Sequence, residues 1–498
     1  MKKLITLLFY ISFILYSQAQ DTLQTNWTLL KTSILANQPA EGWATYVDNN
    51  GYVYWANNQN NVSLEGYDAL LYKLDSNGNE LWSSNSVVGG YNAQQGYVVT
   101  STDSVVYYGG RYCTQTTLDI NLPYCDMFVA SVNPNTGDTN WVFHWDQGYG
   151  YDEVDGIVPM SDGIYITGWT YGNGTYWDMA ILKLDYNGKK IWQNTWGSSK
   201  TDHQDGHIAI DDSMIYVCGA YGVPYYTSVY AGYDGKAILC KFLKADGSFV
   251  DSTQWGRDDF WVINFENALG MTSDGTYLYV TGVTTLSASD IQIFVAKYDK
   301  NLNRIWYHEW GGSVAESARS IKVNNGYVYV GGTTASYGNG GNDAVLLRYD
   351  TQGNFIKYYT WGKSKDESVA DIFISGNDLY LTGNTLSYTS SSYTDAYILQ
   401  ANMSVMTDVE EPIYSLNNNF CTLYPNPCNE NLFINVNEGL SLVESVSVFN
   451  TFGELVLYKE VQNSRKSLNI DLSELSSGLY NVKVLNGNGV FVTKIIKE

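Results

Sequence analysis

The pentapeptide Leu278-Tyr279-Val280-Thr281-Gly282 is one of seven similar copies of a single sequence motif, and these copies decide the fold. Each copy begins with an aliphatic residue followed by a tyrosine, and successive tyrosines lie 50 to 63 residues apart. The other six copies occupy residues 53–57, 106–110, 164–168, 215–219, 328–332 and 379–383. Repeats of this length, built from short β-branched and aromatic runs, predict an all-β chain folded as a seven-bladed β-propeller.

Each repeat contains four strand signals, which in the sixth repeat lie at 318–323, 327–331, 343–348 and 355–361. The third signal is a nearly continuous apolar run, which is typical of a strand covered on both faces. An Asp or Asn followed by Gly then predicts a tight turn into the fourth strand. The seventh repeat lacks a fourth strand, whereas residues 26–30 resemble one. We therefore expect the N-terminal segment to complete the seventh blade, which removes the unpaired sheet edges.

The composition of the 498 residues limits the partners of the protein. The formal net charge is −23, and no basic run occurs in the chain. Phosphate binding needs clustered Lys and Arg, so nucleic acid is excluded as an expected partner. The same acidity argues against binding to an anionic membrane surface.

The first residues have the features of a secretory signal. Lys2 and Lys3 precede an apolar run at 4–16, and Ser17-Gln18-Ala19 offers small residues at the expected cleavage site. We predict a signal peptide at 1–19, with cleavage after Gln20 as the neighbouring alternative. No other stretch resembles a membrane span, so no transmembrane segment is expected after its removal.

Export makes disulfide bonds an expected feature, and the cysteines fall into local pairs. These pairs are Cys113 with Cys125, Cys218 with Cys240, and Cys421 with Cys428. Three disulfides are one interpretation, although the connectivity does not follow from the sequence. Six buried free thiols are the alternative.

The pattern changes after the repeats. We assign residues 21–405 to the propeller, 406–419 to a linker, and 420–498 to a second domain. Short alternating strands in the last segment predict a small Ig-like β-sandwich.

Two resemblances support this division. Most of residues 27–405 resembles the bacterial SBBP repeat family, through the successive motifs D/N-G-x-Y-V-T-G, D-A-x-x-x-K-L-D and N-G-x-x-x-W. The C-terminal segment resembles a type IX secretion sorting domain, type A, of Bacteroidetes. The matching motifs are Tyr424-Pro425-Asn426-Pro427, the stretches 446–453 and 470–480, and Lys494-Ile495-Ile496-Lys497. This resemblance implies passage through the periplasm, the type IX machinery and a sortase-like protease as partners, and a secreted or cell-surface location.

Long aromatic loops are the first candidate binding region, because function often lies in long loops on a rigid scaffold. Tyr and Trp rings there suit stacking on sugar rings, although packing of the loops against neighbouring blades explains them equally well. The candidate ligand-binding residues are Trp169, Tyr171, Tyr176, Trp177, Tyr225, Tyr226, Tyr230 and Tyr233.

A mostly acidic column forms a second candidate. The residue thirteen positions before each repeat tyrosine is expected at the mouth of the central channel. This ring comprises Glu41, Gln94, Asp152, His203, Glu266, Glu316 and Glu367. It would suit a divalent cation or a polyhydroxyl ligand. The favoured alternative is structural, with each acid accepting hydrogen bonds from backbone amides.

The fourth repeat departs from the others. His203, Asp205 and His207 alternate, so on a strand they would share one face and could form a metal or acid–base cluster. Ordinary loop histidines are the alternative.

No catalytic motif such as G-x-S-x-G, H-E-x-x-H or a P-loop is present, so no catalytic residue is assigned and no cofactor is expected beyond a cation at the channel mouth. The sequence favours an exported, non-enzymatic binding module for a glycan or a surface protein. The alternatives are a carbohydrate-active lyase or hydrolase at the channel mouth, and a structural spacer.

Overall fold

The computed structural model describes residues 20–33, 38–61, 66–85, 93–114, 124–147, 150–172, 176–204, 207–223, 235–256, 266–287, 290–389, 392–403, 421–436, 443–450, 455–461, 467–473, 475–486 and 489–498. The contacts divide the chain into two compact units, Met1–Val405 and Met406–Glu498. All named elements of the described residues are β-strands. The predicted signal peptide at 1–19 and the predicted linker at 406–419 lie outside these residues.

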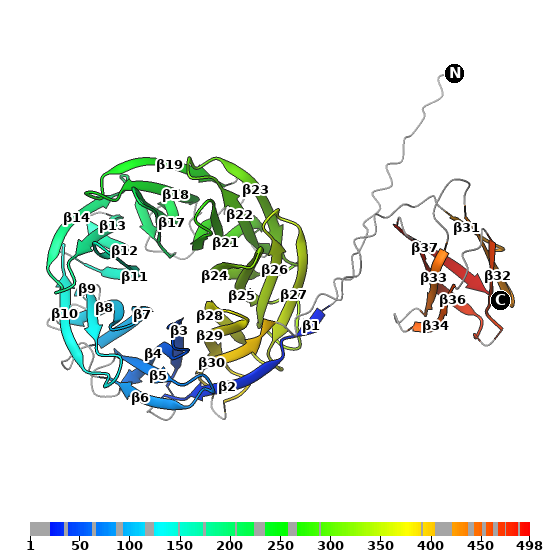
Figure 1. The fold of residues 1–498 in the computed structure, drawn as a ribbon, viewed down its shortest axis with the longest axis horizontal. Helices are drawn as coiled ribbons and strands as arrows, with labels where there is room; N and C mark the ends of the chain where they lie inside the picture. The colour runs from blue at the N-terminus through cyan, green and yellow to red at the C-terminus, as the bar shows by residue number, and fades with distance from the viewer. Residues whose placement is uncertain are drawn as a thin grey trace, which may run out of the picture. The chain divides into compact units, whose positions relative to one another are not determined.

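The strands of the first unit belong, in the part of the chain that the structure describes, to seven sheets arranged around a ring (Figure 1). The first sheet contains β3 (Ala40–Val47), β4 (Val53–Asn61), β5 (Gly66–Leu74) and β6 (Glu80–Ser84). The second contains β7 (Ala93–Ser101), β8 (Val106–Thr114), β9 (Tyr124–Val132) and β10 (Thr139–Trp145). The third contains β11 (Asp152–Met160), β12 (Gly163–Gly172), β13 (Tyr176–Leu184) and β14 (Lys190–Trp196).

The fourth sheet contains β15 (Thr201–Gln204), β16 (Ala209–Ile210), β17 (Met214–Val223), β18 (Lys236–Leu243) and β19 (Phe249–Trp255). The fifth contains β20 (Asn267–Ser273), β21 (Leu278–Ser287), β22 (Asp290–Tyr298) and β23 (Arg304–Trp310). The sixth sheet contains β24 (Glu316–Asn324), β25 (Tyr327–Thr334), β26 (Asp343–Asp350) and β27 (Phe355–Trp361). The seventh contains β28 (Glu367–Ser375), β29 (Asp378–Thr385) and β30 (Asp395–Asn402). Consecutive strands within a sheet pair antiparallel, and Figure 1 shows the first strands β3, β7, β11, β24 and β28 nearest the centre of the ring.

The N-terminal segment joins the last sheet. Strand β2 (Thr25–Lys31) pairs antiparallel with β30, with Leu29 opposite Ile398. It supplies the outer strand that the seventh repeat lacks. The Trp27 indole N–H also donates to the carbonyl of Ser76 in the first sheet, at 3.0 Å. The segment therefore links the last sheet of the ring to the first.

The short strand β1 (Gln20–Thr22) was not anticipated from the sequence. It pairs in parallel with β27, with Asp21 opposite Tyr359, and extends the sheet of β24–β27 to five strands. Leu23, which follows it, is 4% exposed. The described N-terminal residues therefore pair with two different sheets in succession.

The structure explains why a tyrosine recurs in each copy of the motif. All seven are buried, and several hydroxyls donate to an aspartate in the turn of their own hairpin. Tyr279 donates to Asp274 at 2.9 Å, and Tyr216 donates to Asp211 at 3.0 Å. Burying a tyrosine costs little when its hydroxyl has a partner. The tyrosine thus packs between sheets while holding a turn closed.

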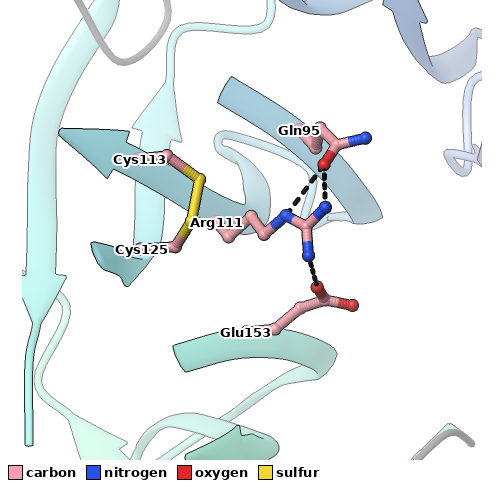
Figure 2. The surroundings of a disulfide bond; sticks show 5 residues. All are labelled: Gln95, Arg111, Cys113, Cys125 and Glu153. Carbon is pink, nitrogen blue, oxygen red and sulfur yellow. Dashed lines mark hydrogen bonds and ion pairs between the residues drawn. A yellow bond between two sulfur atoms is a disulfide. The ribbon is translucent and has the colours of Figure 1, made fainter. Parts of the chain in front are cut away.

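The disulfide prediction is right for one pair and wrong for two. Cys113 and Cys125 are bonded across β8 and β9 (Figure 2). Cys218 and Cys240 are free and buried. Cys218 lies opposite Leu239 and Cys240 opposite Val217, so the two thiols point to opposite faces of the sheet.

The third predicted pair is also free. Cys421 and Cys428 are buried thiols in the core of the second unit. Cys428 Sγ donates instead to the carbonyl of Ile496, at 3.5 Å. Burial raises the pKa of the Cys421 thiol to about 12, which keeps it protonated and unreactive.

The second unit consists of two sheets that share one apolar core. The first contains β31 (Cys421–Tyr424), β32 (Asn431–Val436) and β35 (Ser467–Asp471). The second contains β33 (Val443–Phe449), β34 (Leu455–Glu460), β36 (Gly478–Asn486) and β37 (Gly489–Lys497). Core residues come from both sheets, for example Ile434 and Ile470 from one and Val448 and Val482 from the other. Packing of two sheets across one core is the arrangement of a β-sandwich.

Candidate ligand-binding site

The innermost strands share a local irregularity. In six of them the pairing register shifts across one residue, which is left without a partner on the second strand. These bulged residues are Trp43, Tyr97, Asp155, Leu269, Arg319 and Ala370. A bulge re-aims the side chain of the extra residue. All six line one cavity of about 300 Å³ at the centre of the ring.

The cavity has further walls of mixed chemistry. Arg111, Glu153, Trp169, Trp177 and His207 also line it. Small-molecule sites in proteins are typically concave, with aromatic walls and a few placed polar groups. The central cavity has this composition and lies at the small end of the usual size range.

Aromatic rings form two groups in the cavity wall. Trp43 meets Tyr97 edge to face, with ring centroids 4.9 Å apart, and its indole N–H donates to Glu41 at 3.1 Å. Trp169 and Trp177 lie with centroids 4.7 Å apart and planes 33° apart. These contacts hold the rings in fixed orientations.

Arg111 connects two neighbouring sheets at the cavity (Figure 2). Its Nη1 pairs with Glu153 at 3.1 Å, and its Nε donates to Gln95 at 2.8 Å. The guanidinium lies 5.6 Å from the Tyr97 ring. Burial raises the pKa of the Tyr97 hydroxyl well above its usual value, and the nearby Glu153 carboxylate adds to this rise. Tyr97 is therefore a neutral donor at physiological pH.

Asp371 lines the cavity and makes several polar contacts. Its carboxylate accepts the Thr45 N–H at 3.0 Å and the Ser320 hydroxyl at 2.7 Å. Lys322 Nζ lies 3.8 Å away and His207 Nε2 lies 3.5 Å away. His207 belongs to the fourth sheet and Asp371 to the seventh, so this contact crosses the centre of the ring.

The electrostatics of Asp371 follow from these contacts. Burial alone would raise the pKa of the Asp371 carboxyl. Lys322, His207 and the Thr45 N–H outweigh burial and lower the pKa to about 2. The carboxylate is therefore ionised at physiological pH.

The structure places three of the predicted ligand residues at the cavity, namely Trp169, Trp177 and His207. Tyr171 is half-buried beside Gly150 and is not part of the cavity wall. The remaining predictions lie outside the described residues. They concern Asp205, Tyr225, Tyr226, Tyr230 and Tyr233, together with the side chains of Tyr176 and His203. The predicted cluster of His203, Asp205 and His207 is accordingly untested.

The predicted ring of acids is largely buried within its own sheets. Glu316 is 2% exposed and accepts the Thr334 hydroxyl at 3.1 Å and the Ser336 N–H at 3.1 Å. Glu367 makes the equivalent contacts with Thr385 and Ser387. These carboxylates hold the turns between strands, as the structural alternative expected. Gln94, Asp152 and Glu266 are buried as well.

Two members of the predicted ring are displaced by one residue. In the fourth sheet Asp202, rather than His203, is buried and accepts the Gly222 N–H at 2.7 Å, twenty residues further on. In the first sheet Ala40, rather than Glu41, occupies the equivalent pairing position. A one-residue shift in register sends every side chain to the opposite face. Counting back from the tyrosine could not detect it.

Acidic residues come together at one place outside the central cavity. Among the described residues, carboxylate oxygens of Asp126, Asp146 and Asp152 lie within 4.8 Å of one another. Burial raises the pKa of the Asp152 carboxyl to about 6, and the two neighbouring acids add to the rise. Oxygen ligands of this kind suit a hard cation such as Ca²⁺.

Sequence reasoning missed most of the cavity. Trp43, Tyr97, Asp155 and Arg319 were not among the candidates. The signal was present, since five of the six bulged residues lie ten positions before a repeat tyrosine, and Trp43 lies eleven before. Their chemistry changes from repeat to repeat, whereas scaffold positions remain similar.

Comparison with known proteins identifies one part of the chain. Residues 422–498 match the family described as "Secretion system C-terminal sorting domain". A tail of this family implies export by the type IX system, to the cell surface or into the medium. The search of curated proteins found no match. No helix within the described residues has the length and apolar character needed to cross a membrane.

Solved structures offer distant likenesses to the ring. Drosophila Plexin A in complex with Semaphorin 1b is 9% identical, with 77% of this chain and 88% of that chain covered and a TM-score of 0.44. The β-propeller domain of the Trilobed protease from Pyrococcus furiosus is 11% identical, with 76% and 99% covered and a TM-score of 0.40. A subtype N11 neuraminidase-like protein of A/flat-faced bat/Peru/033/2010 is 9% identical, with 61% and 86% covered and a TM-score of 0.34. The ring of antiparallel sheets in this chain is itself propeller-like.

Proposed function

We propose that this chain is an exported binding protein whose seven-bladed propeller of SBBP-type repeats binds a glycan in the central cavity. The proposed route begins with a signal peptide at 1–19 in a member of the Bacteroidetes. It continues with the Ig-like type A tail, the type IX machinery and a sortase-like protease. The matched tail at 422–498 supports this route.

The observation that carries the binding proposal is the convergence of six bulged strands on one cavity. Its aromatic walls contain Trp43, Tyr97, Trp169 and Trp177, and its polar groups include Arg111 and Glu153. Flat apolar rings stack on the C–H faces of sugars, while charged groups bind their hydroxyls. A cavity of about 300 Å³ also favours a small ring-shaped ligand over a protein surface.

Glycan-array screening of the purified full chain, followed by calorimetry, tests this proposal. We expect Trp43→Ala to weaken glycan binding by about 10-fold or more, because truncating a central aromatic anchor commonly costs about 2 kcal/mol. Tyr52→Ala is the matched control, since Tyr52 lies in the turn between β3 and β4 and is not part of the cavity wall. Absence of any glycan ligand, or equal affinities of the two variants, would contradict the proposal.

A carbohydrate-active lyase or hydrolase is the second candidate. It is favoured by the carboxylates of Glu153 and Asp155, two positions apart on β11, which line the same cavity as His207. Incubation of the chain with each glycan that it binds, followed by chromatography of the products, separates the two functions. Turnover that is lost in His207→Ala while binding is retained would favour the enzyme.

A further inference from the structure

A second cavity adjoins the central one. It measures about 290 Å³ and lies between the first, sixth and seventh sheets. Trp43, Arg319 and Ala370 line both cavities. Each cavity lies at the small end of the size range of ligand sites, and the three shared residues place the two cavities side by side, with these residues at their junction.

Arg319 is the charged residue at this junction. It is the bulged residue of β24, it is exposed, and its guanidinium lies 5.7 Å from the Trp43 ring. Within the described part of the chain it has no ion pair with a carboxylate. Arg111, by contrast, is paired with Glu153. The planar donors of Arg319 are therefore available to a ligand.

The surroundings of Arg319 hold the junction in shape. The indole of Trp43 is fixed by its hydrogen bond to Glu41 and by the edge of Tyr97. A guanidinium over an aromatic face keeps its edge N–H groups free for a carboxylate or sulfate. Bidentate contacts to such oxyanions are among the stronger hydrogen bonds in proteins.

We infer that Arg319 binds an anionic substituent, a carboxylate or a sulfate, of an acidic oligosaccharide that spans both cavities. This inference rests on the proposed glycan binding and names the ligand class. The net charge of −23 opposes anions in general. Exposed charges further than about 8 Å are largely screened at physiological salt, so selectivity depends on the charges that line the two cavities. Glu153 is paired with Arg111, and Asp371 with Lys322 and His207, whereas Arg319 has no such partner among the described residues. Glu41 and Asp155 are the other acids of the lining.

The test uses the purified full chain and three probes, namely oligogalacturonate, a sulfated galactan oligomer and a neutral galactan oligomer. We expect the chain to bind an acidic probe more tightly than the neutral one. Arg319→Gln should weaken binding of that acidic probe by about 10-fold or more, since hydrogen bonds between charged groups are roughly twice as strong as those between neutral groups. Binding of the neutral probe should change little. The two acidic probes distinguish a carboxylate from a sulfate.

Two further variants sharpen the result. Arg304→Gln is the matched control, because Arg304 is exposed over the Tyr307 ring on the outer strand β23. Glu41 is an acid that lines the second cavity, so Glu41→Gln should strengthen binding of the acidic probe. The affinity for that probe should also fall with added salt in the unmodified chain and less so in Arg319→Gln.

Each failure has a distinct meaning. Equal binding of acidic and neutral probes, with no effect of Arg319→Gln, overturns the role of Arg319 while leaving glycan binding intact. If no probe binds and the glycan array is also empty, the proposed function itself fails. Thermal melting of each variant shows whether a loss of binding reflects unfolding.

Discussion

At the scale of single residues, Asp371 shows how the ring is held at its centre. One carboxylate receives contacts from the first, fourth and sixth sheets, through Thr45, His207, Ser320 and Lys322. A buried charge is stable only when its partners replace the lost water. The network therefore links sheets that are distant in the ring.

The pH dependence of stability follows from Asp371. Its folded-state pKa of about 2 lies below the unfolded value of about 3.9, so its contribution is fully present above about pH 4 and is lost as the pH falls toward 2. We expect Asp371→Asn to reduce the free energy of unfolding by about 2–3 kcal/mol at pH 7. The difference from the unmodified chain should shrink near pH 2.5. Urea unfolding at both pH values measures this.

Asp212→Asn serves as the control for an exposed acid. A constant difference between Asp371→Asn and the unmodified chain at both pH values would contradict the assignment. So would an equal effect of the two substitutions.

At the scale of elements, a tryptophan and a glycine join neighbouring sheets repeatedly. A Cβ at Gly78 would lie 2.7 Å from the Trp27 ring, and one at Gly188 would lie 2.7 Å from the Trp141 ring. The same indoles donate to carbonyls of these turns, as Trp141 does to Tyr186 at 3.1 Å. Each turn glycine thus allows both its left-handed backbone and the approach of the adjacent sheet.

This contact predicts unequal effects of two similar glycine substitutions. Gly78→Ala and Gly51→Ala both place alanine at a φ of about 80°, but only Gly78 lies against a ring. We expect Gly51→Ala to cost about 1 kcal/mol and Gly78→Ala about 2–4 kcal/mol. Chemical denaturation of both variants checks the difference. Equal costs would mean that the Trp27 contact adds nothing to closure of the ring.

The cysteines give a second prediction for the elements. Alkylation of the denatured, unreduced chain should modify four cysteines, Cys218, Cys240, Cys421 and Cys428, and alkylation after reduction should modify six. Mass spectrometry counts the added groups. Two or fewer modified cysteines before reduction would contradict this prediction and would indicate further disulfides.

At the scale of the whole molecule, the chain divides into two units with different candidate roles. The ring carries the candidate site, and residues 422–498 match a sorting-domain family. We expect deletion of residues 422–498 to retain the protein in the periplasm of its host, since a tail of this family implies export by the type IX system. Immunoblots of cell fractions measure this. The control is a periplasmic reporter fused to the same tail, which should be exported, and retention of that reporter would contradict the assignment.

Much of the fold could be predicted from the sequence, because its signals are local. The motif around Tyr279, the Asp-Gly turns and the strand-like residues 26–30 each specify structure over a few neighbours. The site was harder to predict. Trp169, Trp177 and His207 were found because their segments looked unusual, whereas Arg319 looked like an ordinary strand residue.

The sequence by itself determined the repeated strands, the antiparallel hairpins and the export tail, since residues close together in the chain encode each of them. Only the tertiary structure decided that Cys218 and Cys240 point to opposite faces and that Asp202 replaces His203, because strand register is a property of two strands together. It also decided that Trp43 and Arg319 meet. Closure of the ring, which no local pattern describes, brings the first and sixth sheets to one cavity.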